Sequence, residues 1–211
     1  MSLKFLHQYR KDIIFSQNGE EGIILECVRR MEDAFLTNKG HAVEIGGNDG
    51  RYCSNTALLL QQYGWTGLFV EADYGLYLKS KQNWAHMPEV RHQCCKVDEH
   101  NINAFVHDDC TLLSLDTDGS DYRIFRGLQS HPAIVIVEID SSIPPLSNSF
   151  NRDGAAGYYA MTVAALERGY FVLCHTGNLV LVRDEFKHLF PDVKGHPLID
   201  YELYFNPQWL T

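Results

Sequence analysis

The stretch HAVEIGGNDG (residues 41–50) decides the fold of this chain. Its apolar run ends in Glu44 and is followed at once by three glycines, Gly46, Gly47 and Gly50. Glycine between a strand and a loop lets the backbone approach a ligand closely, and open α/β sheets bind ligands beyond the carboxyl ends of their strands. The loop lacks the GxGxxG spacing of dinucleotide sites and carries acids at Glu44 and Asp49, which repel phosphates. It therefore predicts either a site for a cationic ligand or a plain turn between strand and helix, and both interpretations stay open at this point.

On both sides of this stretch, short β-branched runs alternate with helical stretches, a pattern typical of a parallel sheet with helices on both faces. The inner strands are nearly continuous apolar runs, as expected when both sheet faces are covered. Near the end of the chain, Thr176, Gly177 and Asn178 separate two β runs, which predicts an antiparallel hairpin. We expect strands at residues 41–46, 67–72, 90–97, 112–117, 133–139, 171–175 and 179–183, and helices at residues 18–36, 55–63, 75–84, 102–107, 122–129 and 158–168.

The length of 211 residues suits one domain. We divide it into an N-terminal helical extension (residues 1–36), a core (residues 41–190) and an aromatic tail (residues 191–211). Residues 141–156 are rich in Ser, Pro and Asn, so we expect a loop or lid there. The aromatic side chains of the tail are predicted to pack on the domain or on a partner chain, which leaves a homodimer open. They are Tyr201, Tyr204, Phe205 and Trp209.

The composition argues against several classes of protein. The formal net charge is −9 and no cluster of Lys and Arg is present to neutralise phosphates, so nucleic acid is not an expected partner. No apolar run is long enough to span a bilayer, and the first residues do not resemble a signal peptide. Six cysteines show neither CxxC pairs nor zinc spacing, which predicts reduced thiols in a cytoplasmic protein without membrane contact.

Acids follow the next two predicted strands. Glu71 ends the strand at 67–72, where a carboxylate can accept hydrogen bonds from both hydroxyls of a ribose. The alternative is a solvated acid at a strand end. Asp98 follows the third strand and could accept from the amino group of an adenine, or could cap the following helical turn.

Further acids gather where the strands at 112–117 and 133–139 end. Oxygen ligands at such a place suit Mg²⁺, for which we select Asp116, Asp118 and Asp140. The acids could instead act without a metal, in cofactor binding and proton removal, or could simply cap turns. Of the histidines, His175 near the hairpin turn is a candidate catalytic base. The whole acidic set is Asp116, Asp118, Asp121, Glu138 and Asp140.

Seven blocks, in this order, resemble the FkbM-like branch of the class I S-adenosylmethionine-dependent methyltransferases. They are SQNGEEGII (16–24), VEIGGNDGRYCSNTALLLQQYGWTGLFVEAD (43–73), HNIN (100–103), LLSLDTDGSDYRIF (112–125), VIVEIDSSIPP (135–145), RGY (168–170) and HTGNLVLVRD (175–184). The resemblance implies a Rossmann-like fold with a seven-stranded, mostly parallel sheet closed by an antiparallel hairpin. It also implies contacts to the cofactor from Glu44, Gly46, Gly47, Asp49, Glu71, Asp98 and Asp116, the last facing the methionine end.

The chain departs from the family at EID (residues 138–140), where the family reads close to EYN. Asp140 there adds negative charge, which favours a metal or a cationic group on the substrate. The leading hypothesis is an O-methyltransferase acting on a small acceptor such as a sugar or natural product, with Asp116, Asp140 or His175 as candidates for removing the hydroxyl proton. The alternative is a non-catalytic cofactor-binding or assembly module that keeps the fold.

Overall fold

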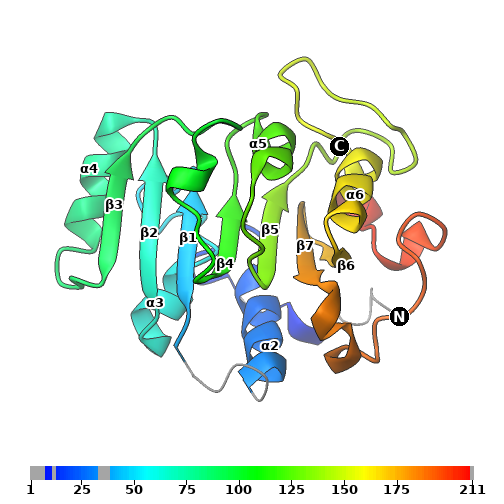
Figure 1. Ribbon diagram of the computed structural model, residues 1–211, viewed down its shortest axis with the longest axis horizontal. Helices are drawn as coiled ribbons and strands as arrows, with labels where there is room; N and C mark the ends of the chain where they lie inside the picture. Colours follow the sequence, from blue (N-terminus) through cyan, green and yellow to red (C-terminus); the bar gives the residue numbers. More distant parts are fainter. Residues whose placement is uncertain (1–7, 11–12, 33–38, 210–211) are drawn as a thin grey trace.

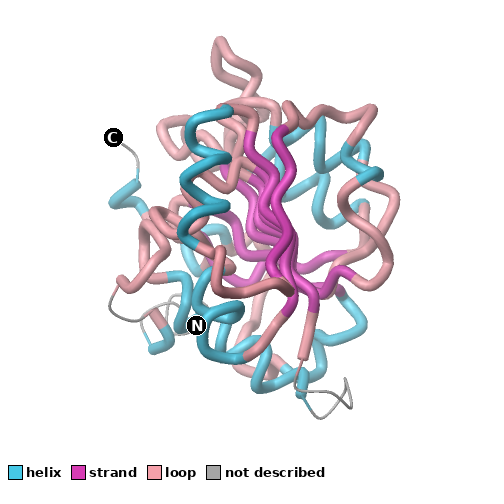
Figure 2. The backbone as a smooth tube through the Cα atoms, turned by 90° about the vertical axis from the view of Figure 1, so that its left-hand side faces the viewer, coloured by secondary structure: helices cyan, strands magenta, loops and turns pink. Residues whose placement is uncertain are grey.

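A computed structural model of the chain describes residues 8–10, 13–32 and 39–209. Seven strands form one sheet in the order β3-β2-β1-β4-β5-β7-β6. Strands β1 to β5 pair in parallel, whereas β7 lies antiparallel between β5 and β6. Helices cover both sides of the sheet (Figures 1 and 2). This is the Rossmann-like fold of class I methyltransferases, and it confirms the predicted fold class.

Each predicted strand is present within a few residues of its expected bounds. The strands are β1 (His41–Ile45), β2 (Thr66–Glu71), β3 (Val90–Cys94), β4 (Cys110–Leu115), β5 (Ile134–Glu138), β6 (Tyr170–His175) and β7 (Asn178–Arg183). The helices are α2 (Glu20–Glu32), α3 (Ala57–Tyr63), α4 (Tyr74–Asn83), α5 (Asp121–Gly127) and α6 (Tyr158–Glu167), with short 3-10 turns η1 (Ile102–Ala104), η2 (Asp184–Leu189), η3 (Tyr201–Leu203) and η4 (Pro207–Trp209). The helix expected at 102–107 is a single 3-10 turn, and the end of the helix expected at 18–36 lies outside the described residues.

Two hydrophobic clusters lie on opposite faces of the sheet because successive strand side chains point to opposite sides. In β5, Val135 and Val137 belong to the cluster under α5 and α6, whereas Ile134 and Ile136 belong to the cluster under α2 and α3. All four side chains are at most 1% exposed. The continuous apolar runs of the sequence therefore correspond to strands that are buried on both faces.

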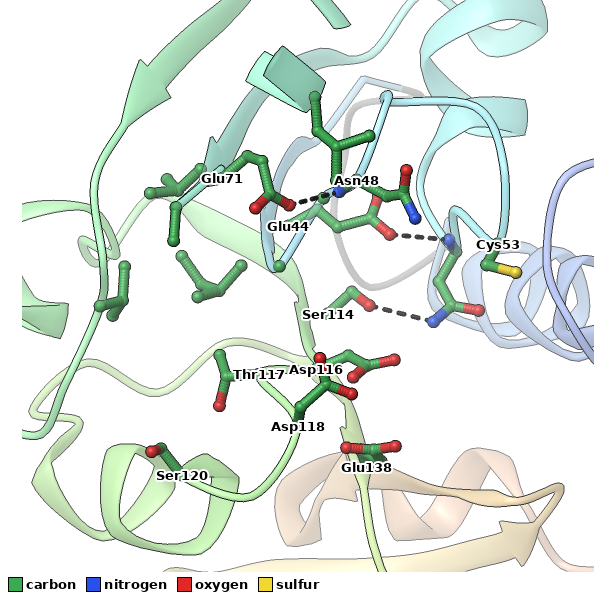
Figure 3. Close-up of a pocket in the computed structure, with 18 of the residues that line it drawn as sticks. Glu44, Asn48, Cys53, Glu71, Ser114, Asp116, Thr117, Asp118, Ser120 and Glu138 are labelled. Carbon is green, nitrogen blue, oxygen red and sulfur yellow. Dashed lines mark hydrogen bonds between the residues drawn. The ribbon is translucent and has the colours of Figure 1, made fainter. Parts of the chain in front are cut away.

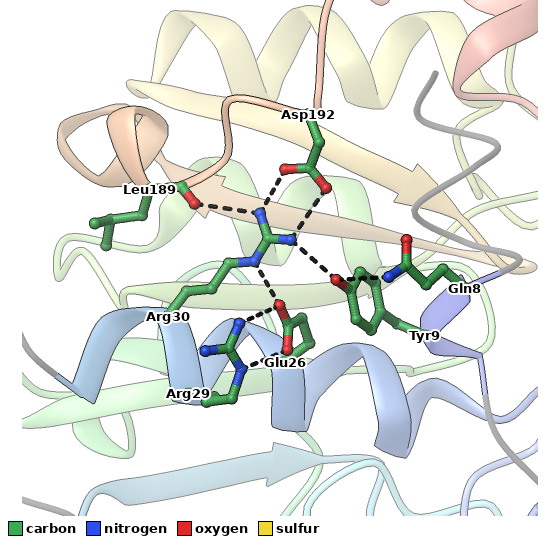
Figure 4. A network of polar contacts seen from close by, with 7 residues as sticks. All are labelled: Gln8, Tyr9, Glu26, Arg29, Arg30, Leu189 and Asp192. Carbon is green, nitrogen blue, oxygen red and sulfur yellow. Dashed lines mark hydrogen bonds and ion pairs between the residues drawn. The ribbon is translucent and has the colours of Figure 1, made fainter.

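An ionic network ties α2 to the segment after η2 (Figure 4). Arg30 donates to Asp192 at 2.5 and 3.0 Å and to Glu26 at 2.7 Å, and it also binds the carbonyl oxygen of Leu189. Hydrogen bonds from Arg29, opposed by partial burial, lower the pKa of Glu26 to about 2. The N-terminal helix is therefore held to the C-terminal part of the domain by charge as well as by apolar packing.

The aromatic tail packs on its own domain. Tyr204 and Phe205 are 3% and 2% exposed, and the Phe205 ring lies 4.7 Å from the His175 ring and 5.3 Å from the Tyr158 ring. The predicted loop between β5 and α6 is present and is closed by a bridge between Phe150 and Ala156. Within the described ranges, no helix is long and apolar enough to cross a bilayer.

Candidate functional site

The carboxyl ends of β1, β2, β4 and β5 meet at one edge of the sheet because these strands run parallel. The strand order reverses between β1 and β4, so the connections after them leave in opposite directions and open a crevice. A cavity of about 430 Å³ lies there (Figure 3). Its lining includes Glu44, Gly46, Gly47, Asn48, Cys53, Asn55, Glu71, Ser114, Asp116, Thr117, Asp118, Ser120 and Glu138.

The loop after β1 is pressed against both neighbouring strands. The amides of Gly46 and Gly47 both donate to the carbonyl oxygen of Val70 in β2, at 2.9 and 3.2 Å. On the other side, a Cβ placed on Gly46 would lie only 1.6 Å from the carbonyl oxygen of Asp116, and the φ of Gly46 is +76°. Only glycine fits this position, and the floor of the cavity is bare backbone as a result.

Glu71 is half-buried at the end of β2 and faces the glycine loop. One carboxylate oxygen accepts from the amide of Asn48 at 2.8 Å, and the other accepts from the amide of Asp73 at 2.8 Å. Each oxygen retains a lone pair for a ligand. The two backbone bonds fix the direction of the carboxylate, so it is ready to accept hydrogen bonds from a diol.

Glu44 is almost fully buried and holds the start of α3. Its carboxylate accepts from the hydroxyls of Ser54 and Thr56 and from the amide of Asn55. Burial raises the pKa of Glu44, and these hydrogen bonds partly oppose the rise. Asn55 in turn donates to Ser114 at 3.0 Å, and its own side-chain oxygen is buried without a partner among the described residues.

Three carboxylates meet at the opposite wall of the cavity. Oxygens of Asp116, Asp118 and Glu138 lie within 4.8 Å of one another. Burial and then the charges of Asp116 and Asp121 raise the pKa of Glu138, and burial and then the charge of Asp121 raise the pKa of Asp116. Acids so close in a partly buried place either share protons or surround a cation.

A second cavity of about 480 Å³ adjoins the first. It lies beside the loop after β5 and the hairpin turn, between the β4–α5 connection and Trp209. Gln17, Asp118 and Glu138 line both cavities. The carboxylate wall therefore separates two spaces that are each large enough for a small molecule.

Several predicted residues lie elsewhere. Asp49 does not line the 430 Å³ cavity, because its carboxylate turns back to accept from the amides of Arg51 and Tyr52. Asp98 also lies outside that lining and accepts from the amides of His100 and Asn101, which matches the capping alternative.

Two corrections concern the predicted catalytic and metal residues. Asp140 does not belong to the close carboxylate group, and Glu138 takes its place; Asp140 lines the second cavity instead. His175 lines neither cavity and is 0% exposed, stacked on Phe205 with its ring bonded to Ser141 and to the amide of Asn206. Burial lowers the pKa of His175 to about 3, which keeps the ring neutral in its packed position away from both cavities.

Other lining residues were not predicted. Asn48 has a φ of 49°, and Asn is among the few residues that tolerate this region, so its place in a glycine-rich loop was a usable signal. Gln17 gave no such signal. It reaches the cavities because Glu21 accepts from the amides of Ile14, Phe15 and Ser16 and so fixes the segment before α2.

Comparison with known proteins supports the fold. The structure of monomeric WbdD matches with a TM-score of 0.55 and 14% identity over 84% of this chain and 44% of that one. An RNA methyltransferase from Salinibacter ruber in complex with S-adenosyl-L-homocysteine matches with a TM-score of 0.36 and 20% identity over 53% of this chain and 72% of that one. Phosphoethanolamine N-methyltransferase 1 from Haemonchus contortus, solved with phosphoethanolamine and S-adenosylhomocysteine, matches with a TM-score of 0.45 and 15% identity over 81% of this chain and 40% of that one.

Among these three structures only WbdD exceeds a TM-score of 0.5, and at 14% identity its likeness concerns the fold alone. The chain spans less than half the length of WbdD and of the N-methyltransferase. No protein-family profile and no curated protein matches the chain.

Proposed function

We propose that this protein is an S-adenosylmethionine-dependent methyltransferase. The observation that carries the proposal is the cavity at the reversal of strand order, with the bare Gly46–Gly47 backbone on one side and the oriented carboxylate of Glu71 on the other. A ligand that combines a diol with cationic groups suits these two features. No phosphate-binding glycine pattern is present in the loop.

The residues of the cavity fit the parts of that cofactor. Glu71 would accept from the ribose hydroxyls, and Gly46 allows close approach of the ligand to the backbone. The buried, unpartnered side-chain oxygen of Asn55 and the acids of the opposite wall are acceptors suited to the cationic methionine end. When bound, the cofactor supplies a methyl group on a positively charged sulfur.

We further propose that the acceptor atom is a hydroxyl oxygen, as the resemblance to FkbM-like enzymes implies. The oxygen forms the new bond to the methyl carbon, the carbon–sulfur bond breaks with its electron pair going to sulfur, and the hydroxyl proton must leave. Glu138 lines both cavities and adjoins Asp116 in the close carboxylate group, so this pair of carboxyl groups is placed to take up the hydroxyl proton on whichever member is ionised. Asp140 is a poorer base because hydrogen bonds from Ser142 and Asn151 outweigh its partial burial and lower its pKa.

The acids Asp116, Asp118 and Glu138 could do the same work around Mg²⁺, which would lower the pKa of the acceptor hydroxyl. We favour the metal-free interpretation, because burial and neighbouring carboxylates raise the pKa of both Asp116 and Glu138, and a proton shared within the group relieves their mutual repulsion. Titration with MgCl₂, with and without S-adenosylhomocysteine, separates the two: heat from one tight site that Glu138→Gln abolishes would establish the cation.

The cofactor site is tested by calorimetric titration with S-adenosylhomocysteine. We expect micromolar binding by the wild type, binding weakened by about tenfold or more in Glu71→Ala, since charge-assisted hydrogen bonds contribute about 1.5–3 kcal/mol, and a smaller loss in Glu71→Gln. Glu89→Gln is the matched control, because Glu89 is exposed and lies before β3, at the opposite end of the sheet.

The possible outcomes are distinct. Absence of binding by well-folded wild type would overturn the proposal. Equal binding by the Glu71 variants and the control would show that the cofactor does not bind at the end of β2. Tight binding with no methyl transfer to any acceptor in a broad screen would favour the assembly-module alternative.

A further inference from the structure

The second cavity has the position expected of a methyl acceptor. It shares Gln17, Asp118 and Glu138 with the proposed cofactor cavity, so a molecule bound in it would meet the cofactor at the carboxylate wall. Its volume of about 480 Å³ lies within the usual range for small-molecule sites. The loop after β5 and the hairpin turn form its outer side.

The charge of this cavity is one-sided. Four of the side chains that line it are carboxylates (Asp118, Glu138, Asp140 and Asp153), and none of the described residues in its lining is Lys or Arg. Arg10 is bound to the carbonyl oxygen of Asn18 and lies over the ring of Trp209. Arg152, next to Asp153 in the chain, is exposed and is not part of the lining. A phosphorylated, sulfated or carboxylated acceptor would be repelled here.

The carboxylates differ in the number of hydrogen bonds that they already accept from the protein. Asp140 accepts from the amide and hydroxyl of Ser142 and from the side-chain amide of Asn151. Asp118 and Asp153 show no side-chain hydrogen bond to any described residue. They come from segments in direct contact, since a Cβ on Gly119 would lie 3.0 Å from the carbonyl oxygen of Asp153.

Groups suited to hydroxyls complete the cavity. Its lining adds the amides of Asn18 and Asn178, both more than nine-tenths buried, and the hydroxyls of Ser141 and Ser142. The indole N–H of Trp209 is buried without a partner among the described residues. Such a lining offers both donors and acceptors to a polyhydroxylated molecule, while its net charge selects for a cation.

We infer that the second cavity binds the methyl acceptor, and that this acceptor is a small polyhydroxylated molecule carrying a protonated amine. The inference rests on the proposed methyltransferase function. Asp153 and Asp140 hold the ammonium group at the outer end of the cavity. One hydroxyl then lies at the wall between the cavities, where the Asp116–Glu138 carboxyl pair takes up its proton as the oxygen bonds to the methyl carbon.

The test uses three hexose probes of different charge, of which the first two differ only at the nitrogen on C2. D-glucosamine is the cation, N-acetyl-D-glucosamine the neutral analogue and D-glucose 6-phosphate the anion. Each is titrated calorimetrically into the full chain saturated with S-adenosylhomocysteine, at pH 6.5 and low salt. We expect glucosamine to bind at least tenfold more tightly than the acetylated sugar, and the phosphate not to bind.

Variants then locate the cation. Asp153→Asn and Asp140→Asn should each weaken glucosamine binding at least fivefold and leave the affinity for S-adenosylhomocysteine unchanged. Asp109→Asn is the control, because Asp109 is exposed just before β4, at the far end of the sheet. Since Asp153 is exposed on a loop, its variant is expected to fold.

Equal affinity for the amine and its acetylated analogue would overturn the inference, as would failure of all three sugars to bind a chain that binds S-adenosylhomocysteine. Failure of S-adenosylhomocysteine itself would instead refute the proposed function. Amine binding that the Asp variants leave unchanged would place the cation outside this cavity.

Discussion

Replacement of Gly46 by alanine tests the close approach that shapes the cofactor cavity. The added methyl group would lie 1.6 Å from the carbonyl oxygen and 2.8 Å from the carbonyl carbon of Asp116, both backbone atoms that no side-chain rotation can move. The φ of +76° adds the cost of a left-handed conformation, about 1–2 kcal/mol. Forcing β1 and β4 apart adds about 1–3 kcal/mol, as for other overpacked positions. The expected loss of stability is therefore about 2–5 kcal/mol.

Gly169→Ala separates the two contributions. Gly169 has nearly the same φ, +75°, but a Cβ there meets no atom within 4 Å. It carries the conformational cost alone, about 1–2 kcal/mol, and the same gain from a less flexible unfolded chain. The difference between the two variants measures the clash with Asp116.

Urea unfolding followed by the fluorescence of the buried Trp65 and Trp84 gives both free energies of unfolding. We expect Gly46→Ala to be less stable than Gly169→Ala by at least about 1 kcal/mol, and to bind S-adenosylhomocysteine more weakly even at temperatures where it is folded. Equal stabilities would refute the reasoning, because they would mean that the loop after β1 can leave β4 without cost.

Three further predictions concern charged groups. Arg30→Leu should lower the free energy of unfolding by about 1.5–3 kcal/mol, because it leaves Asp192 without its partner and removes one of the two guanidinium partners of the buried Glu26, whereas Arg29→Leu, at an exposed side chain, should change it much less; similar urea midpoints would contradict this. The pKa of Glu138 is raised in the folded state, so its contribution to stability is present below pH 4.5 and is lost as the pH rises, at no more than about 1.4 kcal/mol per pH unit. Glu138→Gln should flatten this dependence of stability on pH and be more stable than the wild type at pH 8. An unchanged profile would show that Glu138 titrates normally. His175 gives the opposite pH dependence of stability: its pKa is lowered from 6.5 to about 3, so stability is lost as the pH falls from 6.5 towards 3. His175→Gln should remove that acid sensitivity and leave the pH profile of methyl transfer unchanged. A shifted activity profile would show that His175 acts as a catalytic base.

The fold was predictable because local patterns and global topology agree. The apolar runs of β1, β4 and β5 are long enough to mark strands buried on both faces, and the turn at Thr176–Asn178 marks the hairpin. The sequence could not show that β7 lies between β5 and β6, because pairing partners of an antiparallel strand depend on the whole sheet. Strand ends were predicted less well, as in β3, which ends at Cys94 rather than at residue 97.

The strand-end residues of the site were predictable for the same reason. Once β1, β2 and β4 are parallel, Gly46, Glu71 and Asp116 must gather at one edge of the sheet. The positions of the Asp49 and Asp98 side chains were harder to predict. Both residues lie in loops, where a short acidic side chain readily accepts hydrogen bonds from the backbone amides two or three residues further on. The sequence gives no direct sign of that choice.

The exchange of Asp140 for Glu138 and the burial of His175 share a physical cause, which is a break in strand alternation. Glu138 and Asp140 would point to the same side of a continuous strand, but β5 ends at Glu138, and the amide of Asp140 already pairs with Ala156 in the following loop. In β6, the pairing with β7 shifts between Val172 and Cys174, so that Leu173 and Cys174 both join the cluster beneath α2 and α3. His175 is thereby turned to the opposite face, under α6 and Phe205, instead of following Phe171 and Leu173. A single extra residue in a strand reverses the side on which every later side chain lies, and the amino-acid pattern of β6 does not reveal it.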